Sequence, residues 1–201
     1  DGLVSCANAV VLSIMLDTTA MQANLTYMKK LVLPLVILTV FPVLASAHEF
    51  WLDPADYQVD TGETIIADLK NGQNFEGVSL PFNTHSFERF TLLVDGTTTD
   101  TVGRLGDRPG LQNEAAQDGL HIYSYQSTIS HVSYKVYEKF QTFADYKSFK
   151  DMRALHQARN LPDVNFQEAY TRYAKTLIDV GHGRGSDVQT GLEAELVALQ
   201  N

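Results

Sequence analysis

The sequence predicts a mainly β protein, a sandwich of antiparallel strands, with a helical insertion near residues 138–180. Short strand-like runs separated by turn residues fill the stretch from His48 to about Tyr137, as in sandwich folds. From Glu138 onwards the apolar residues are instead spaced by three, which is typical of helices. With 44% hydrophobic residues, a chain of 201 residues can bury a core of one domain, or one and a part.

The β part, residues 48–137, is expected to contain at least four strands. Thr64 to Leu69 begins the series, and Phe87 to Val94 leads into the turn dipeptide Asp95-Gly96. The glycine- and proline-rich run GRLGDRPG, residues 103–110, indicates a turn with a salt bridge rather than a phosphate-binding loop. Two neighbouring strands should follow it, at residues 119–126 and 131–137.

The helical segment, residues 138–181, is expected to begin with the evenly spaced aromatic residues Phe140, Phe143, Tyr146 and Phe149. DMRALHQARN, residues 151–160, contains good helix formers, and its His156 is expected to face solvent. Asp163 is then placed as the N-cap of a last helix that ends near Gly181. The apolar face of this helix would comprise Phe166, Ala169, Tyr170, Tyr173, Leu177 and Ile178.

Residues 182–201 are predicted to start a further strand-rich part that the chain does not complete. The stretch GHGRG, residues 181–185, indicates a flexible loop. Leu192 to Leu199 alternates partly like a strand. No closing turn or cap follows before the chain stops at Asn201, so more strands are expected in the whole protein.

Residues 28–47 have the three parts of a secretory signal peptide. Met-Lys-Lys is followed by the apolar run LVLPLVILTVFPVL and by the cleavage pattern Ala45-Ser46-Ala47. This run is shorter than the roughly 20 residues that span a bilayer, so we expect cleavage after Ala47, a periplasmic protein that begins at His48, and no membrane span. Residues 1–27 precede a good start at Met28 and indicate an over-extended N-terminus.

Composition narrows the classes of partner and ligand. The formal net charge of −9 argues against a nucleic-acid partner. Cys6, the only cysteine, precedes the cleavage point, so a metal site would use histidine, carboxylate or backbone ligands. Neither a GxSxG nor an HExxH motif, a P-loop or a dinucleotide fingerprint is present, so the sequence does not support an enzyme.

His48 is the main candidate for a metal ligand. After cleavage its α-amine and its imidazole Nδ1 can chelate one divalent ion, and copper and nickel favour such nitrogen-rich sites. A third ligand would come from a carboxylate such as Glu49 or from another imidazole. The alternative is that His48 simply begins a strand at the surface.

The other histidines offer weaker candidates. His121 lies on a predicted strand, and it could face His131 across a hairpin. His182 lies among glycines, where exposure is expected. His85 and His156 complete the set of imidazoles after the cleavage point. The candidate metal ligands are therefore His48, Glu49, His121 and His182.

The mature start HEFWLDP, residues 48–54, resembles that of a bacterial periplasmic family of unknown function often labelled as a nickel or cobalt uptake accessory component. GRLGDRPG, Gly119-Leu120-His121, YKVYEKFQTF (residues 134–143) and EAYTRYAKTLIDVG (residues 168–181) follow in the family's order. The resemblance implies an immunoglobulin-like or transthyretin-like sandwich, a helical insertion and a role in divalent metal binding or transport, with a membrane transporter component as a partner. It also implies a further strand-rich portion.

Three functional hypotheses follow. The first is a non-enzymatic periplasmic protein that binds nickel, cobalt or copper through His48. The second is a metal-free sandwich module that docks on another envelope protein or a carbohydrate. The third is an oxidative copper enzyme with a histidine brace, which requires a second imidazole close to His48. Under any of these hypotheses Trp51, the only tryptophan, is expected to pack the first strand into the sandwich rather than to bind a ligand.

Overall fold

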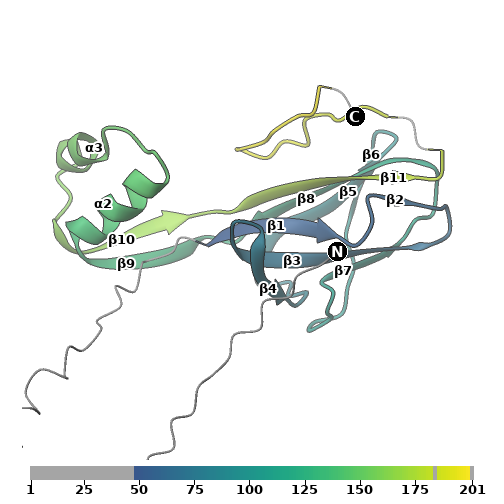
Figure 1. Cartoon of the computed structure of the whole chain (residues 1–201), viewed down its shortest axis with the longest axis horizontal. Coiled ribbons are helices and arrows are strands. Elements are labelled where there is room, and N and C mark those ends of the chain that lie inside the picture. Colours follow the sequence, from purple (N-terminus) through teal and green to yellow (C-terminus); the bar gives the residue numbers. More distant parts are fainter. Residues whose placement is uncertain (1–47, 183–184, 200–201) are drawn as a thin grey trace, which may run out of the picture. The chain divides into compact units, whose positions relative to one another are not determined.

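The computed structural model describes residues 48–182 and 185–199 (Figure 1). These residues belong to one compact unit. The predicted N-terminal extension (residues 1–27), with Cys6, and the predicted signal peptide (residues 28–47) lie outside the described residues. His48 is the first residue described, and it leads directly into a strand.

The first sheet is built around β3 (Thr64–Gln73). β1 (Glu49–Pro54) and β4 (Glu76–Leu80) pair antiparallel with β3, and β7 (Leu111–Glu114) pairs with its first residues. Alternate side chains of a strand point to opposite faces of the sheet. The buried hydrophobic residues of β3 follow this period of two: Ile65, Ala67 and Leu69.

The second sheet has the strand order β2-β11-β8-β5-β6 among the described residues. β8 lies in its centre and pairs antiparallel with both β11 and β5. β2 pairs with only the last two residues of β11. The strands of this sheet are β2 (Gln58–Val59), β5 (Phe87–Val94), β6 (Thr97–Asp100), β8 (Gly119–Ser127) and β11 (Tyr173–Val180).

The main core contains side chains from both sheets, which confirms the predicted sandwich. The Phe50 ring of β1 packs on the Tyr125 ring of β8 with a centroid distance of 4.5 Å. Such aromatic pairs contribute beyond the area that they bury. The buried core residues are Leu52, Ile65, Ala67, Leu69, Phe82, Phe90, Leu111, Ala115, Tyr123, Tyr125, Ile178 and Val180.

A second, smaller core confirms the helical insertion and restricts its helices to residues 137–158. β9 (Ser130–Val136) pairs with β10 (Val164–Tyr170), and α2 (Tyr137–Tyr146) and α3 (Met152–Ala158) connect them. Figure 1 shows β9 and β10 continuing the direction of β8 and β11. Aromatic residues of both strands and of α2 form this core: Tyr134, Tyr137, Phe140, Phe143 and Phe166.

His156 of α3 is buried, so the expectation that it faces solvent is wrong. Its side chain is 4% exposed and donates a hydrogen bond from Nε2 to the carbonyl oxygen of Pro162 at 3.0 Å. Its ring also meets the rings of Tyr137 and Phe166 at centroid distances of 4.7 and 4.8 Å. The helix turns this residue inwards because the insertion has its own aromatic core.

The helix predicted from Asp163 to Gly181 is wrong, because the segment forms β10 and β11. β11 pairs with β8 over its full length, from Tyr173 to Val180. Its buried residues alternate, at Thr176, Ile178 and Val180, and all three are β-branched. Helix propensity is a weak preference that such long-range pairing overrides.

Two other expectations about strands need correction. The predicted strands at residues 119–126 and 131–137 exist as β8 and β9, but they pair with β11 and β10 rather than with each other. His131 therefore lies opposite Ala169, not opposite His121. Leu192 to Leu199 forms no strand, and residues 185–199, the C-terminal segment, have no regular secondary structure.

The loop at residues 103–110 behaves as predicted, with a salt bridge of 3.0 Å between Arg104 and Asp107.

Trp51 does not pack into the sandwich as predicted. Phe50 and Leu52 face the core, so their neighbour Trp51 points to the opposite side of β1. There it meets Phe75 edge-on, with a centroid distance of 5.9 Å.

Candidate functional site

His48 and Glu49 are both exposed at the beginning of β1. Pairing of Glu49 with Gly72 fixes this end of the strand against β3. The carboxylate Oε1 of Glu49 accepts a hydrogen bond from Nζ of Lys147 at 2.9 Å. This hydrogen bond and the charge of Lys147 lower the pKa of Glu49, so the carboxylate beside His48 is ionised at neutral pH.

The end of α2 contacts the sandwich next to His48. Lys147 follows the last residue of α2, and the preceding Tyr146 hydrogen-bonds through its hydroxyl to the side chain of Gln73. Sequence reasoning missed Lys147, because it lies 98 residues from Glu49 along the chain. Only the fold brings the two residues together.

His121 lies inside the protein and away from His48. It is 1% exposed and donates a hydrogen bond from Nε2 to the Gln117 carbonyl oxygen at 3.0 Å. Its Nδ1 has no hydrogen-bond partner among the described residues. This nitrogen is one of the buried polar atoms for which native proteins normally provide a partner or a water.

The strand register shows how His121 and His48 are separated. His121 lies opposite Ile178, close to the end of β11 that pairs with β2. The start of β1 lies near a different part of β8. Its Phe50 packs on Tyr125, which lies four residues further along β8 than His121. Four residues of a strand extend about 13 Å. His48, which precedes Phe50, therefore lies towards the opposite end of the sandwich.

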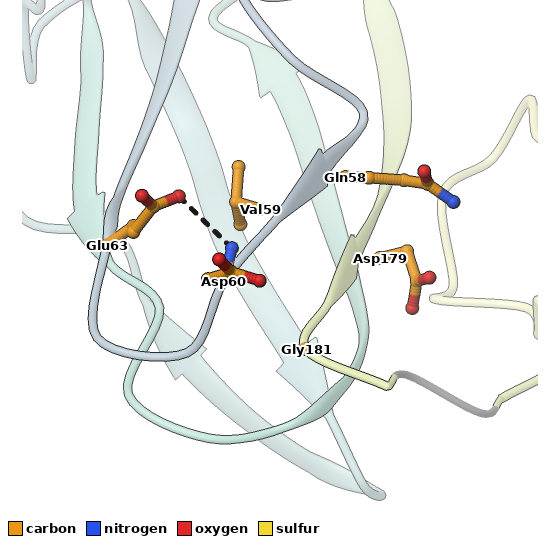
Figure 2. A pocket seen from close by; sticks show the side chains of 6 residues that line it. All are labelled: Gln58, Val59, Asp60, Glu63, Asp179 and Gly181. Atoms are coloured by element: carbon orange, nitrogen blue, oxygen red, sulfur yellow. Dashed lines mark hydrogen bonds between the residues drawn. The ribbon is translucent and has the colours of Figure 1, made fainter.

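His182 is exposed and follows Gly181 at the end of β11, near a small acidic pocket (Figure 2). Carboxylates of Asp60, Glu63 and Asp179 line this pocket, but Figure 2 shows them pointing in different directions. Glu63 Oε2 accepts a hydrogen bond from the backbone N–H of Asp60 at 3.1 Å. The three carboxylates of the pocket therefore do not converge on a common binding position.

The four predicted ligands do not meet in one centre. Only His48 and Glu49 are neighbours, while His121 and His182 belong to the other end of the sandwich. In residues 48–182 and 185–199, no group of three or more histidine, cysteine, aspartate or glutamate side chains has metal-binding geometry. The local donor set is thus the His48 residue with the Glu49 carboxylate.

A buried ion-pair network is the second feature that the sequence did not reveal. Lys175 of β11 lies 2.8 Å from the carboxylate of Asp187 and 3.0 Å from that of Glu195. Burial alone would raise the pKa of Glu195, but hydrogen bonds from Thr190 and Lys175 outweigh it and lower this pKa to about 2. The network holds the C-terminal segment against β11.

Comparison with known proteins gave one match. The model of a family described as a domain of unknown function (DUF4198) matches residues 45–201. Neither the curated proteins nor the solved structures gave a match. Among the described residues, no helix is long and apolar enough to cross a bilayer, and α2 and α3 are both too short.

Proposed function

We propose that this chain, which belongs to the DUF4198 family of domains of unknown function, is a non-enzymatic periplasmic protein that binds a divalent transition metal through His48. The observation that carries the proposal is the position of His48. It is exposed, it directly follows the cleavage pattern Ala45-Ser46-Ala47, and it directly precedes β1, which is paired with β3 along its length. Cleavage after Ala47 would thus present an amine and an imidazole on a fixed backbone.

The chemistry of this donor set favours copper or nickel. The α-amine and the imidazole Nδ1 of one residue are two nitrogen donors, and N-rich sites suit Cu(II) and Ni(II). Cobalt follows in the same order of affinity, just below nickel. Glu49 supplies an ionised carboxylate next to the chelate, at present paired with Lys147. If Glu49 binds the metal ion, the ion would therefore replace Lys147 as the positively charged partner of this carboxylate.

Three of the remaining histidines favour a single anchor over a histidine brace. His121 and His156 are buried within the protein and hydrogen-bonded through Nε2. His182 lies at the other end of the sandwich. Because no three histidine, cysteine, aspartate or glutamate side chains of the described residues form a metal-binding group, metal carriage in uptake or homeostasis fits the donor set better than oxidative copper catalysis. The partner would then be a membrane transporter component that receives the ion.

Calorimetric titration of the protein recovered from the periplasm tests this function. We expect submicromolar binding of Cu(II) or Ni(II) at neutral pH and loss of most of this affinity in His48→Ala, which removes the imidazole donor. His182→Ala is the matched control, because His182 is also exposed but lies at the other end of the sandwich. Equal affinities of the wild type and His48→Ala would rule out the proposed site.

A further inference from the structure

A groove lies on the outer side of β1 and β11, and its end at Trp51 and Phe75 is close to the predicted ligand Glu49. Its volume is about 1240 Å³, and its third wall is the C-terminal segment. Alternate residues of the two strands face it, among them Trp51 and Asp53 of β1 and Tyr173, Lys175 and Leu177 of β11. These side chains point outwards because their neighbours in the strands face the core.

The groove has an apolar and aromatic lining that is open to solvent. Phe75 is 87% exposed at the turn between β3 and β4, where it packs edge-on against Trp51. Tyr57 and Leu196 are 60% and 89% exposed. Rigid aromatic side chains that are exposed in this way are common anchors of interaction sites.

The charges of the lining are mainly negative. Lys175 is the only cation among the described residues that line it, and it is neutralised by Asp187 and Glu195, whose side chains are 2% and 6% exposed. Asp53 and Glu193 add two further carboxylates near the rim. Glu193 accepts a hydrogen bond from the Tyr173 hydroxyl at 2.8 Å, which holds it at the groove. The electrostatic complement of this surface is a cation.

We propose that the groove binds an extended segment of a partner protein in which lysine or arginine alternates with aliphatic residues. The aliphatic side chains would pack on Trp51, Phe75 and Leu196, and the cationic ones would pair with Asp53 and Glu193. Cations also bind favourably over the faces of aromatic rings.

Trp51 provides a direct readout, because it is the only tryptophan of the chain. The probe is a blocked hexapeptide of alternating lysine and leucine, titrated into the periplasmic protein in the presence of EDTA. We expect a saturable change in Trp51 fluorescence that weakens with added salt. A peptide of alternating glutamate and leucine should give no saturable change at the same concentrations.

Two substitutions test the assignment to the groove. Asp53→Asn combined with Glu193→Gln should weaken binding of the lysine peptide about tenfold, since it removes two charged partners. Asp56→Asn, an exposed carboxylate outside the lining, is the matched control and should bind like the wild type. His48→Ala should also bind normally, which separates this result from the proposed metal site.

Three results would overturn the proposal. The first is equal binding of the lysine and glutamate peptides. The second is an unchanged affinity in the double variant when its circular dichroism spectrum matches that of the wild type. The third is the absence of any saturable response to the lysine peptide, including the case in which a neutral oligosaccharide perturbs Trp51 instead.

Discussion

Replacing Lys175 with methionine is expected to lower the free energy of unfolding by about 3–5 kcal/mol, the usual cost of removing one partner from a buried ion pair. The substitution leaves the carboxylates of Asp187 and Glu195 without their cation, although their side chains are only 2% and 6% exposed. Chemical denaturation measures this change. Lys150→Met, at an exposed lysine of the insertion, is the control and should change stability little.

The pH dependence of stability gives an independent measure of the same network. The folded pKa of Glu195 is lowered to about 2, below its usual value of 4.5. The stabilisation is therefore present above the usual value and is lost as the pH falls from about 4.5 towards 2. In Glu195→Gln this part of the acid sensitivity should disappear. A Lys175→Met protein as stable as the Lys150→Met control would contradict the role of the network.

Phe166→Ala is expected to cost about 3–5 kcal/mol within the insertion, as is typical for truncation of a buried phenylalanine. Phe166 stacks on Tyr134 at 5.4 Å and meets the rings of Phe140 and His156 at 5.8 and 4.8 Å. Its truncation removes the centre of a core that contains only three buried residues within the described part of the chain. Such a small core has little other apolar contact to compensate for the loss.

Hydrogen exchange locates the effect of this substitution. Amide protons of α2 and α3 should exchange faster in Phe166→Ala, while those of β3 and β8 keep their protection, because they belong to the main core. Val164→Ala is the matched control on the same strand, since Val164 is 54% exposed. Uniformly faster exchange over the whole sandwich would show that the insertion is not a separate unit of stability.

Local patterns were sufficient to predict several strands of the first half of the fold and the first helix of the insertion. Alternating apolar residues and the Asp95-Gly96 turn correctly indicated β5 and the end of that strand. The three-residue spacing of Phe140, Phe143 and Tyr146 correctly indicated α2. These signals are carried by neighbouring residues, which is why they can be read without tertiary contacts.

The prediction for the second half was wrong where strand pairing over long sequence distances determines the structure. The residues after Asp163 contain good helix formers, yet β10 and β11 complete pairs with strands more than twenty residues earlier in the chain. Positive φ at Asn165, 53°, further disfavours a helix there. Neither the pairing partner nor this backbone conformation has a local signature.

The candidate sites also combine features that have a local sequence signal with features that depend on long-range contacts. His48 was singled out by the cleavage pattern, which is a local signal, and the structure shows it exposed next to the start of β1. The partners of this end could not be predicted, because Lys147 reaches Glu49 from α2. The groove likewise depends on the C-terminal segment. This segment is held by the ion pairs of Lys175 with Asp187 and Glu195, which lie 12 and 20 positions further along the chain.

The measurement that tests the central claim most directly is metal affinity before and after acetylation of the His48 α-amine. An α-amine has a pKa of about 7.7–8.0, so near neutral pH it reacts while lysine side chains remain protonated. If the chelate uses this amine, the acetylated protein should lose most of its affinity for Cu(II) or Ni(II), although the imidazole of His48 is intact. Unchanged affinity after complete acetylation would contradict the claim that the cleaved N-terminus is the metal site.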